Sequence, residues 1–168
     1  GGTGGPPTVG DFDADGRAEI AAAGKDSFSV FDPDCTGSPV KAACGTLTKT
    51  GLLWTRISQD HSSSVTGSSV FDFEGDGAAE AVYADECFTR VYDGKTGEVL
   101  YSQWRTSCTW YENPIVADVD GDFNSELVVP SNTNCAIDTA CKANKNHHKH
   151  PTTGATLDPM FKGLRCKK

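Results

Sequence analysis

Three short acidic loops carry the residues of this sequence that could do chemistry. The first reads DFDADGRAE from Asp11, with carboxylates at its positions 1, 3, 5 and 9. A tight turn can point alternate side chains at one centre, and the backbone carbonyl of position 7 can join them. A set of oxygen ligands from one flexible loop suits a hard cation, and Ca²⁺ better than Mg²⁺. The spacing therefore predicts a calcium-binding loop.

The same pattern occurs twice more, so that twelve of the 23 acidic residues lie in three loops. The predicted ligands are Asp11, Asp13, Asp15, Glu19 and the carbonyl of Arg17; Asp72, Glu74, Asp76, Glu80 and the carbonyl of Ala78; and Asp118, Asp120, Asp122, Glu126 and the carbonyl of Asn124. Four crowded carboxylates repel one another without a cation. Three bound Ca²⁺ would change the formal charge from −8 to −2. The alternative is a set of solvated acidic turns that bind no metal.

The three loops differ at two positions. Glycine at position 6 adopts a positive φ at little cost, and Gly16 and Gly77 meet this requirement. Phe123 stands there in the third loop and predicts a strained or rearranged turn. Glu74 replaces the shorter aspartate and is expected to shift the second site. The first loop is thus the best candidate.

An EF-hand also begins D-x-D-x-D-G, but it needs a glutamate at position 12 and flanking helices. Position 12 is Ala22, Tyr83 or Val129 in these loops, and the flanking segments resemble strands. The EF-hand interpretation therefore fails.

Short strands are the elements that must position these loops. The repeated segments span about residues 6–24, 68–85 and 113–131, and each places its loop between two short apolar runs. Further runs rich in aromatic and β-branched residues occur at 28–31, 88–92 and 99–104, with turn residues between the last two. Helical periodicity is nearly absent. The sequence predicts an all-β fold with two to three clusters of about four strands each.

The repeated motif, an apolar run followed by D-x-D-x-D-G-x-x-E and a second apolar run, resembles the FG-GAP or VCBS-type repeats of integrin-α-like β-propellers in secreted bacterial proteins. The resemblance covers about residues 6–131. It implies that each repeat forms a four-stranded antiparallel blade and that the acidic loops bind Ca²⁺ through the residues named above.

A closed propeller has about four to eight blades, whereas this sequence holds about three. An incomplete propeller exposes strand edges and apolar faces, which favours pairing with other chains. We therefore expect a secreted, non-enzymatic calcium-binding protein that acts in extracellular structure or adhesion by self-association into an oligomer or filament. The alternative is a fragment of a larger propeller that binds a glycan or protein ligand.

The charge divides the chain into a body, residues 1–138 with a net charge of −14, and a tail, residues 139–168 with a net charge of +6. The tail is expected to be irregular and to pack on the body. An acidic chain without a basic stripe is a poor nucleic-acid binder. No apolar run approaches the roughly 20 residues of a membrane helix.

Seven cysteines in 168 residues are typical of a secreted protein with disulfides. The closest pairs in sequence are Cys35 with Cys44, Cys87 with Cys108 and Cys135 with Cys141, which leaves Cys166 over. Sequence alone does not settle the connectivity. Metal-bound thiolates are the less favoured alternative, because no C-x-x-C pair is present.

Three other clusters contain residue types that could form a site. Asp60, His61 and Ser62 are adjacent and so do not form a catalytic triad by spacing. The histidines at 147, 148 and 150 could bind Zn²⁺ or Cu²⁺, but a mobile charged tail is favoured. Trp104, Trp110 and Tyr111 could stack on sugar rings, although core packing is the favoured role.

Overall fold

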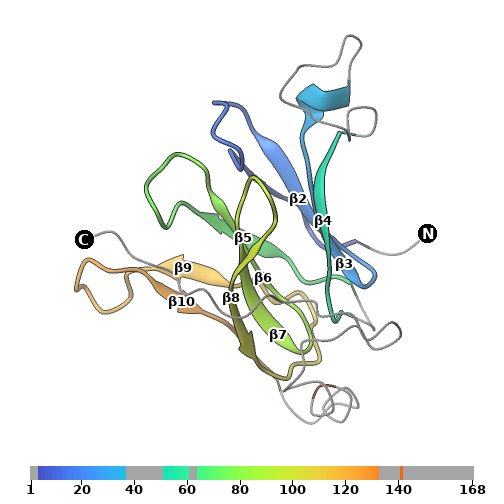
Figure 1. Ribbon diagram of the computed structural model, residues 1–168. Helices are drawn as coiled ribbons and strands as arrows, with labels where there is room; N and C mark the ends of the chain where they lie inside the picture. Colours follow the sequence, from blue (N-terminus) through green and yellow to red (C-terminus); the bar gives the residue numbers. More distant parts are fainter. Residues whose placement is uncertain (1–3, 37–50, 61–63, 133–140, 142–168) are drawn as a thin grey trace.

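The computed structural model of the chain describes residues 4–36, 51–60, 64–132 and 141. Two four-stranded sheets and one two-stranded sheet account for the described strands (Figure 1). The first sheet contains β1 (Thr8–Gly10), β2 (Glu19–Gly24), β3 (Ser27–Phe31) and β4 (Leu52–Ile57). The second contains β5 (Ser68–Phe71), β6 (Glu80–Ala84), β7 (Phe88–Tyr92) and β8 (Val99–Trp104). The third contains β9 (Ile115–Ala117) and β10 (Glu126–Val128), and a short 3-10 helix, η1 (Pro33–Thr36), follows β3.

Every sheet is an antiparallel meander in which neighbouring strands follow one another in sequence. The all-β fold class is therefore confirmed, and so are the strands expected at 28–31, 88–92 and 99–104. The turn between β7 and β8 also forms as expected, because the Gly97 and Asp93 amides donate across it to the carbonyls of Asp93 and Glu98. The strand at 52–57 was missed, although its LLWTRI sequence has the composition of a strand.

The third cluster has two described strands, fewer than the four expected. The sheets lie beside one another like a fan, and the described residues do not close into a ring (Figure 1). The expected tail, apart from Cys141, lies outside the described residues.

The core lies between the first two sheets. Phe28 of β3 stacks on Tyr83 of β6, with ring centroids 4.6 Å apart, and Tyr92 lies 5.7 Å from both Phe28 and Trp54. The Trp54 indole N–H donates to the carbonyl of Gly94 at 2.6 Å. These aromatic contacts fix the position of one sheet against the other.

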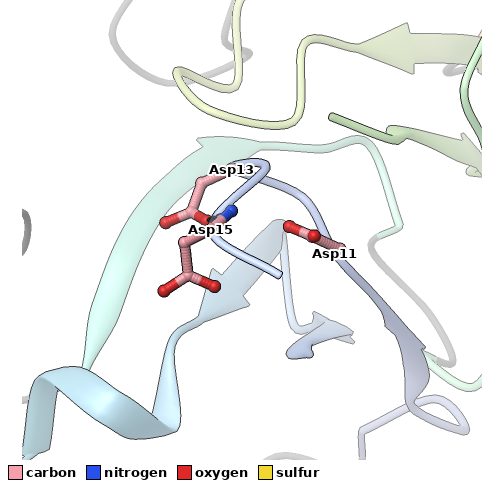
Figure 2. Close-up of side chains that lie close together, drawn as sticks. All are labelled: Asp11, Asp13 and Asp15. Atoms are coloured by element: carbon pink, nitrogen blue, oxygen red, sulfur yellow. Dashed lines mark hydrogen bonds between the residues drawn. The ribbon is translucent and has the colours of Figure 1, made fainter. Parts of the chain in front are cut away.

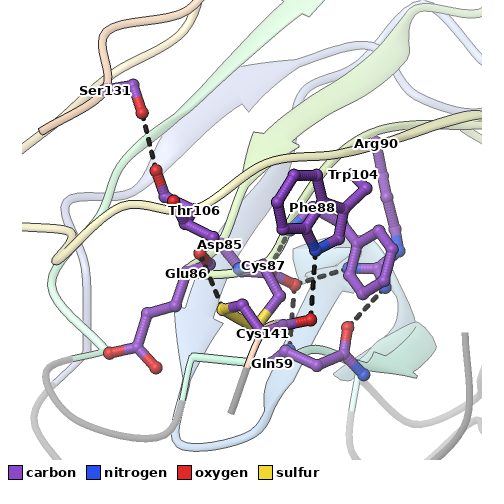
Figure 3. Close-up of a disulfide and its surroundings, with 10 residues drawn as sticks. All are labelled: Gln59, Asp85, Glu86, Cys87, Phe88, Arg90, Trp104, Thr106, Ser131 and Cys141. Carbon is purple, nitrogen blue, oxygen red and sulfur yellow. Dashed lines mark hydrogen bonds and ion pairs between the residues drawn. A yellow bond between two sulfur atoms is a disulfide. The ribbon is translucent and has the colours of Figure 1, made fainter. Parts of the chain in front are cut away.

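The structure overturns two of the disulfide pairs suggested by closeness in sequence. Cys87 bonds to Cys141, 54 residues away, with 5.0 Å between their Cα atoms (Figure 3). Cys87 therefore does not pair with Cys108, and Cys141 does not pair with Cys135. Cys35 and Cys108 are also disulfide-bonded, and Cys44, Cys135 and Cys166 lie outside the described residues. A disulfide forms where the fold brings two Cα atoms together, which short sequence separation does not guarantee.

A buried ion pair lies near the Cys87–Cys141 disulfide, at the start of β7 in the second sheet (Figure 3). Arg90 and Asp85 are almost fully buried and form a salt bridge, and Arg90 also donates to the side-chain carbonyl of Gln59 (Figure 3). The other Asp85 oxygen accepts from the amides of Cys87 and Phe88 at 2.8 and 2.6 Å. The Arg90 guanidinium lies 4.4 Å from the centre of the Phe88 ring. The network thus ties β7 to the turn before it and to the segment after β4.

Candidate metal centre

Each acidic loop connects the first strand of a sheet to the second strand. The loops follow β1, β5 and β9, and in Figure 1 they project from the same side of the fan, coloured blue, green and orange. Ala79, at the end of the second loop, donates its amide to the carbonyl of Asp11 in the first loop at 2.8 Å. The repeated motif therefore occupies the same position in each sheet, between its first and second strands.

Three hydrogen bonds recur in all three loops. The amide of position 6 donates to the aspartate at position 1 (Gly16, Gly77 and Phe123, each at 2.9 Å). The amide of position 7 donates to the aspartate at position 5 (Arg17 at 2.8 Å, Ala78 at 2.9 Å and Asn124 at 2.8 Å). The amide of position 2 donates to the glutamate at position 9 (Phe12 at 2.7 Å, Phe73 at 2.8 Å and Val119 at 2.9 Å). The three loops are thus one structural motif as well as one sequence motif.

The backbone turns into the left-handed region twice in each loop. Position 6 has a φ of 84° at Gly16, 90° at Gly77 and 69° at Phe123. Phe123 therefore strains its turn without rearranging it, since its amide hydrogen bond is kept. Position 4 is left-handed as well, which includes Ala14 with a φ of 64°. This second left-handed position was missed in the sequence.

Two loops bring three aspartates together. In the first, Asp11, Asp13 and Asp15 each place one carboxylate oxygen within 4.8 Å of the others (Figure 2). In the third, Asp118, Asp120 and Asp122 do the same. Among the described residues, the carboxylates of the second loop do not form such a group. Glu74 instead lies close enough to Glu80 to raise the pKa of that carboxyl group, so the glutamate expected to shift this site stands beside another loop carboxyl group.

The glutamate at position 9 holds the loop closed in the structure. It lies outside both groups of three aspartates, while one of its oxygens accepts the amide of position 2 in each loop. Glu19 is fully buried and Glu80 is 3% exposed. Only the second carboxylate oxygen of the position-9 glutamate is therefore left to bind a metal as predicted. The hydrogen bond that this glutamate accepts from the backbone is a role that the sequence did not suggest.

The first loop contains two buried oxygen atoms that have no hydrogen-bond partner. They are Oδ1 of Asp11 and Oε1 of Glu19. A buried carboxylate oxygen without a partner costs about 1–3 kcal/mol or more. A cation with oxygen ligands would satisfy such atoms, so the donor set of the first loop fits Ca²⁺.

Burial raises the pKa of several carboxyl groups in the first two loops. Burial raises the pKa of Glu19 to about 7, against an ordinary value of 4.5, although its hydrogen bond from Phe12 opposes the shift. The pKa of Glu80 rises to about 8, mainly through burial and partly through Glu74. The pKa of Asp13 also rises, through burial and the charge of Asp15. Ionising Glu19 therefore costs folding free energy as the pH increases from about 4.5 to 7, and a bound cation would offset this cost.

The third loop is more exposed, and its pKa values move the other way. Amides of Gly121 and Phe123 lower the pKa of Asp118, and the Asn124 side chain lowers the pKa of Asp122. Asp118 and Asp122 thus stay ionised to lower pH and can bind a cation as anions, whereas in the first loop burial makes an uncompensated negative charge more costly.

Replacing Phe123 with glycine is expected to stabilise the fold by about 0.5–1 kcal/mol. The side chain is 97% exposed, so its removal loses little packing, while the left-handed φ of 69° becomes unstrained. Urea denaturation in excess chelator measures the change. The reciprocal control is Gly16→Ala, where an added Cβ meets nothing within 4 Å, so its expected loss of about 1 kcal/mol reports the backbone alone. Destabilisation of the fold by both variants would contradict the strain at Phe123.

The structure bears on some of the other candidate residues named from the sequence. Asp60 is buried and accepts from the Tyr83 hydroxyl at 3.1 Å and the Ser64 amide at 3.0 Å, while residues 61–63 lie outside the described part. The histidines of the tail lie outside it too. Trp104 packs against the Cys87–Cys141 disulfide, as core packing predicts. Trp110 and Tyr111 do not: they are 67% and 65% exposed.

No protein-family model matches this sequence, including those of the FG-GAP and VCBS repeats that it resembles, and no curated protein matches it. Among the described residues, no helix is long and apolar enough to cross a membrane. A solved structure, that of the Vibrio cholerae biofilm matrix protein Bap1, is similar to this chain with a TM-score of 0.56 and 29% sequence identity. The match covers 68% of this chain and 17% of that chain. The similarity therefore concerns one part of a much longer protein.

Proposed function

We propose that this chain is a non-enzymatic, calcium-binding blade-repeat module of an extracellular structural or adhesion protein. The observation that carries the proposal is the first loop, where three aspartate oxygens lie within 4.8 Å and the buried Asp11 Oδ1 and Glu19 Oε1 lack partners. The third loop repeats the aspartate group. Ca²⁺ would hold the turn between two strands and so couple the stability of each sheet to calcium.

The extracellular role is supported by three features. The biofilm matrix protein Bap1 is similar in structure, the described cysteines form disulfides, and the sheets of the described residues do not close into a ring. Disulfides persist mainly in oxidising compartments outside the cytosol. Open blade faces and strand edges favour self-association, in an oligomer or filament.

Calcium titration by calorimetry tests the metal site. Wild-type protein is expected to bind at least two Ca²⁺, and Asp13→Asn and Asp120→Asn should each remove one site. The matched control is Asp93→Asn, because this aspartate caps the β7–β8 turn at the amide of Thr96 and belongs to no aspartate group. At a calcium concentration of 100 times Kd, each site adds about 2.7 kcal/mol to stability. Absence of binding, or equal binding by Asp13→Asn and wild type, contradicts the proposal.

Light scattering with and without chelator tests self-association. A large particle that dissociates when calcium is removed supports an assembling structural protein whose contacts depend on the loops. A monomer of 17.8 kDa in both conditions contradicts self-association and favours the alternative, a part of a larger propeller.

The alternative, a module that binds a glycan or protein ligand, is favoured by one observation. Trp110 and Tyr111 lie edge to face, with ring centroids 5.3 Å apart, and both are exposed. The neighbouring Cys108 is disulfide-bonded, and its amide donates to Asn132 at 2.8 Å, so the segment is anchored. Exposed aromatic rings on an anchored segment are typical of binding sites. In this case Trp110→Ala should abolish ligand binding and leave calcium uptake unchanged.

A further inference from the structure

Among the described residues, the third sheet ends at its second strand, whereas the first two sheets have further strands there. In the first two, the second strand pairs with a third on its far side: β2 with β3, and β6 with β7. β10 is the equivalent second strand, since Glu126 begins it as Glu80 begins β6. Among the described strands, β10 pairs with β9 alone. Its other edge therefore offers backbone groups for pairing.

The contact between the first two sheets shows what a third strand does. Tyr92, on β7, pairs with Ala81 on β6 and places its ring against Phe28 and Trp54 of the preceding sheet. Val99 of β8 joins the same core. The third strand of a blade thus supplies the aromatic side chain that fills the space between neighbouring sheets.

The corresponding space beside β10 is a groove of about 510 Å³. Thr89, Tyr101 and Gln103 of the second sheet line one wall, and Leu127 and Val129 line the other. Leu127 is equivalent to Ala81, because each follows the loop glutamate and pairs with a valine of the first strand. Tyr101 is equivalent to Trp54, because each pairs with a valine of the third strand. The groove therefore lies where the ring equivalent to Tyr92 would pack.

The groove continues toward the acidic loops. A second hollow of about 410 Å³ shares Phe73 and Ser125 with it and extends to the exposed Phe123 and the carboxylates of Asp72 and Glu74. In an antiparallel pair, residues C-terminal to the ring opposite Leu127 run toward this end of β10. An acidic rim there favours a basic residue in the occupant.

We propose that the open edge of β10 and the groove beside it bind an extended polypeptide strand from a partner chain, antiparallel to β10, with an aromatic side chain opposite Leu127 and a basic residue after it. Strand addition to an exposed edge combines backbone pairing with side-chain pockets. Self-association through the other sheet edges would not fill this groove, because the strands of a second copy that carry the equivalent aromatic position, β3 and β7, are already paired on both sides within their own sheets. The inference rests on the blade arrangement proposed above. The backbone pairing needs no calcium, whereas calcium bound by Asp72 and Glu74 would weaken the preference for a basic residue.

The test uses the full chain and a synthetic peptide with the sequence of residues 86–94, in which Cys87 is replaced by serine. The peptide should bind, and its Asp93→Lys version should bind more tightly. Its Tyr92→Ala version should bind about tenfold more weakly, since an aromatic ring is no longer buried. Fluorescence polarisation of labelled peptide measures these affinities, and calcium uptake of the same sample is measured separately.

Two variants of the protein test whether the peptide binds in the groove beside β10. Leu127→Lys places a charge in the groove and should weaken peptide binding about tenfold or more. Val128→Lys is the matched control on the opposite face of β10, where the side chain is already 41% exposed, and should leave binding unchanged. Hydrogen exchange of the amides of residues 126–129 should slow on peptide binding.

Three results would overturn the inference. The peptide does not bind, and the amides of residues 126–129 are already protected in the chain alone, which means that its own residues cover the edge. Leu127→Lys, but not Val128→Lys, converts a dimer into a monomer, which means that a second copy is the occupant. The two lysine variants bind the peptide equally, which means that it binds elsewhere.

Discussion

Arg90→Met is expected to lower the free energy of unfolding by about 3 kcal/mol or more. Arg90 is 1% exposed, and its salt bridge is with Asp85, which is fully buried. Methionine keeps much of the side-chain volume but removes the positive charge, so the carboxylate of Asp85 stays buried with backbone donors alone. Guanidinium chloride denaturation, with matched calcium in every sample, measures the loss.

The control is Arg17→Met. Arg17 forms a salt bridge with Asp34 at 2.7 Å, but its side chain is 58% exposed. Solvent screens such a pair, so its loss should cost far less than the loss of the buried pair. Adding Asp85→Asn to Arg90→Met should recover part of the stability, because the buried charge is then removed as well. Similar losses for Arg90→Met and Arg17→Met would show that burial gives this pair no special role.

Removing the Cys87–Cys141 disulfide is expected to cost about 4 kcal/mol of stability. The bond joins residues 54 apart in sequence, and it therefore restricts the unfolded chain strongly. The double variant Cys87→Ala with Cys141→Ala tests this by urea denaturation. Both cysteines are fully buried, so a small part of the loss will come from the removed sulfur atoms.

Trp104→Phe separates the covalent bond from its surroundings. The Trp104 indole N–H donates to the carbonyl of Cys141 at 3.1 Å, and phenylalanine removes this hydrogen bond while the disulfide stays. The expected cost is about 1 kcal/mol. If Trp104→Phe destabilised the chain as much as the double cysteine variant, packing rather than the cross-link would hold this region together.

Local patterns in the sequence were enough for most of the strands and for the aspartates of the first and third loops. Alternating and β-branched runs predicted β3, β7 and β8, and Asp93 and Gly97 marked the turn between the last two. The spacing of Asp11, Asp13 and Asp15 predicted their convergence, which the structure shows. These features depend on residues within about ten positions of one another, where backbone geometry fixes what side chains can reach.

Contacts between distant residues could not be predicted in the same way. Proximity in sequence suggested Cys87 with Cys108, but the bond joins Cys87 to Cys141. Trp104 and Trp110 lie close in sequence, yet one packs against the disulfide and the other is 67% exposed. Glu74 was expected to shift the second site, but that it stands beside Glu80, and that no metal-binding group forms there among the described residues, became clear only from the structure.

The sequence by itself determined that the chain is all-β, where most of its strands lie, and that the aspartates of the first and third loops lie together. Only the tertiary structure decided which cysteines pair, that Arg90 and Asp85 form a buried salt bridge, and that a groove lies beside the open edge of β10. The physical reason is that turn and strand preferences act between neighbouring residues, whereas disulfides, buried charges and grooves depend on how whole sheets pack.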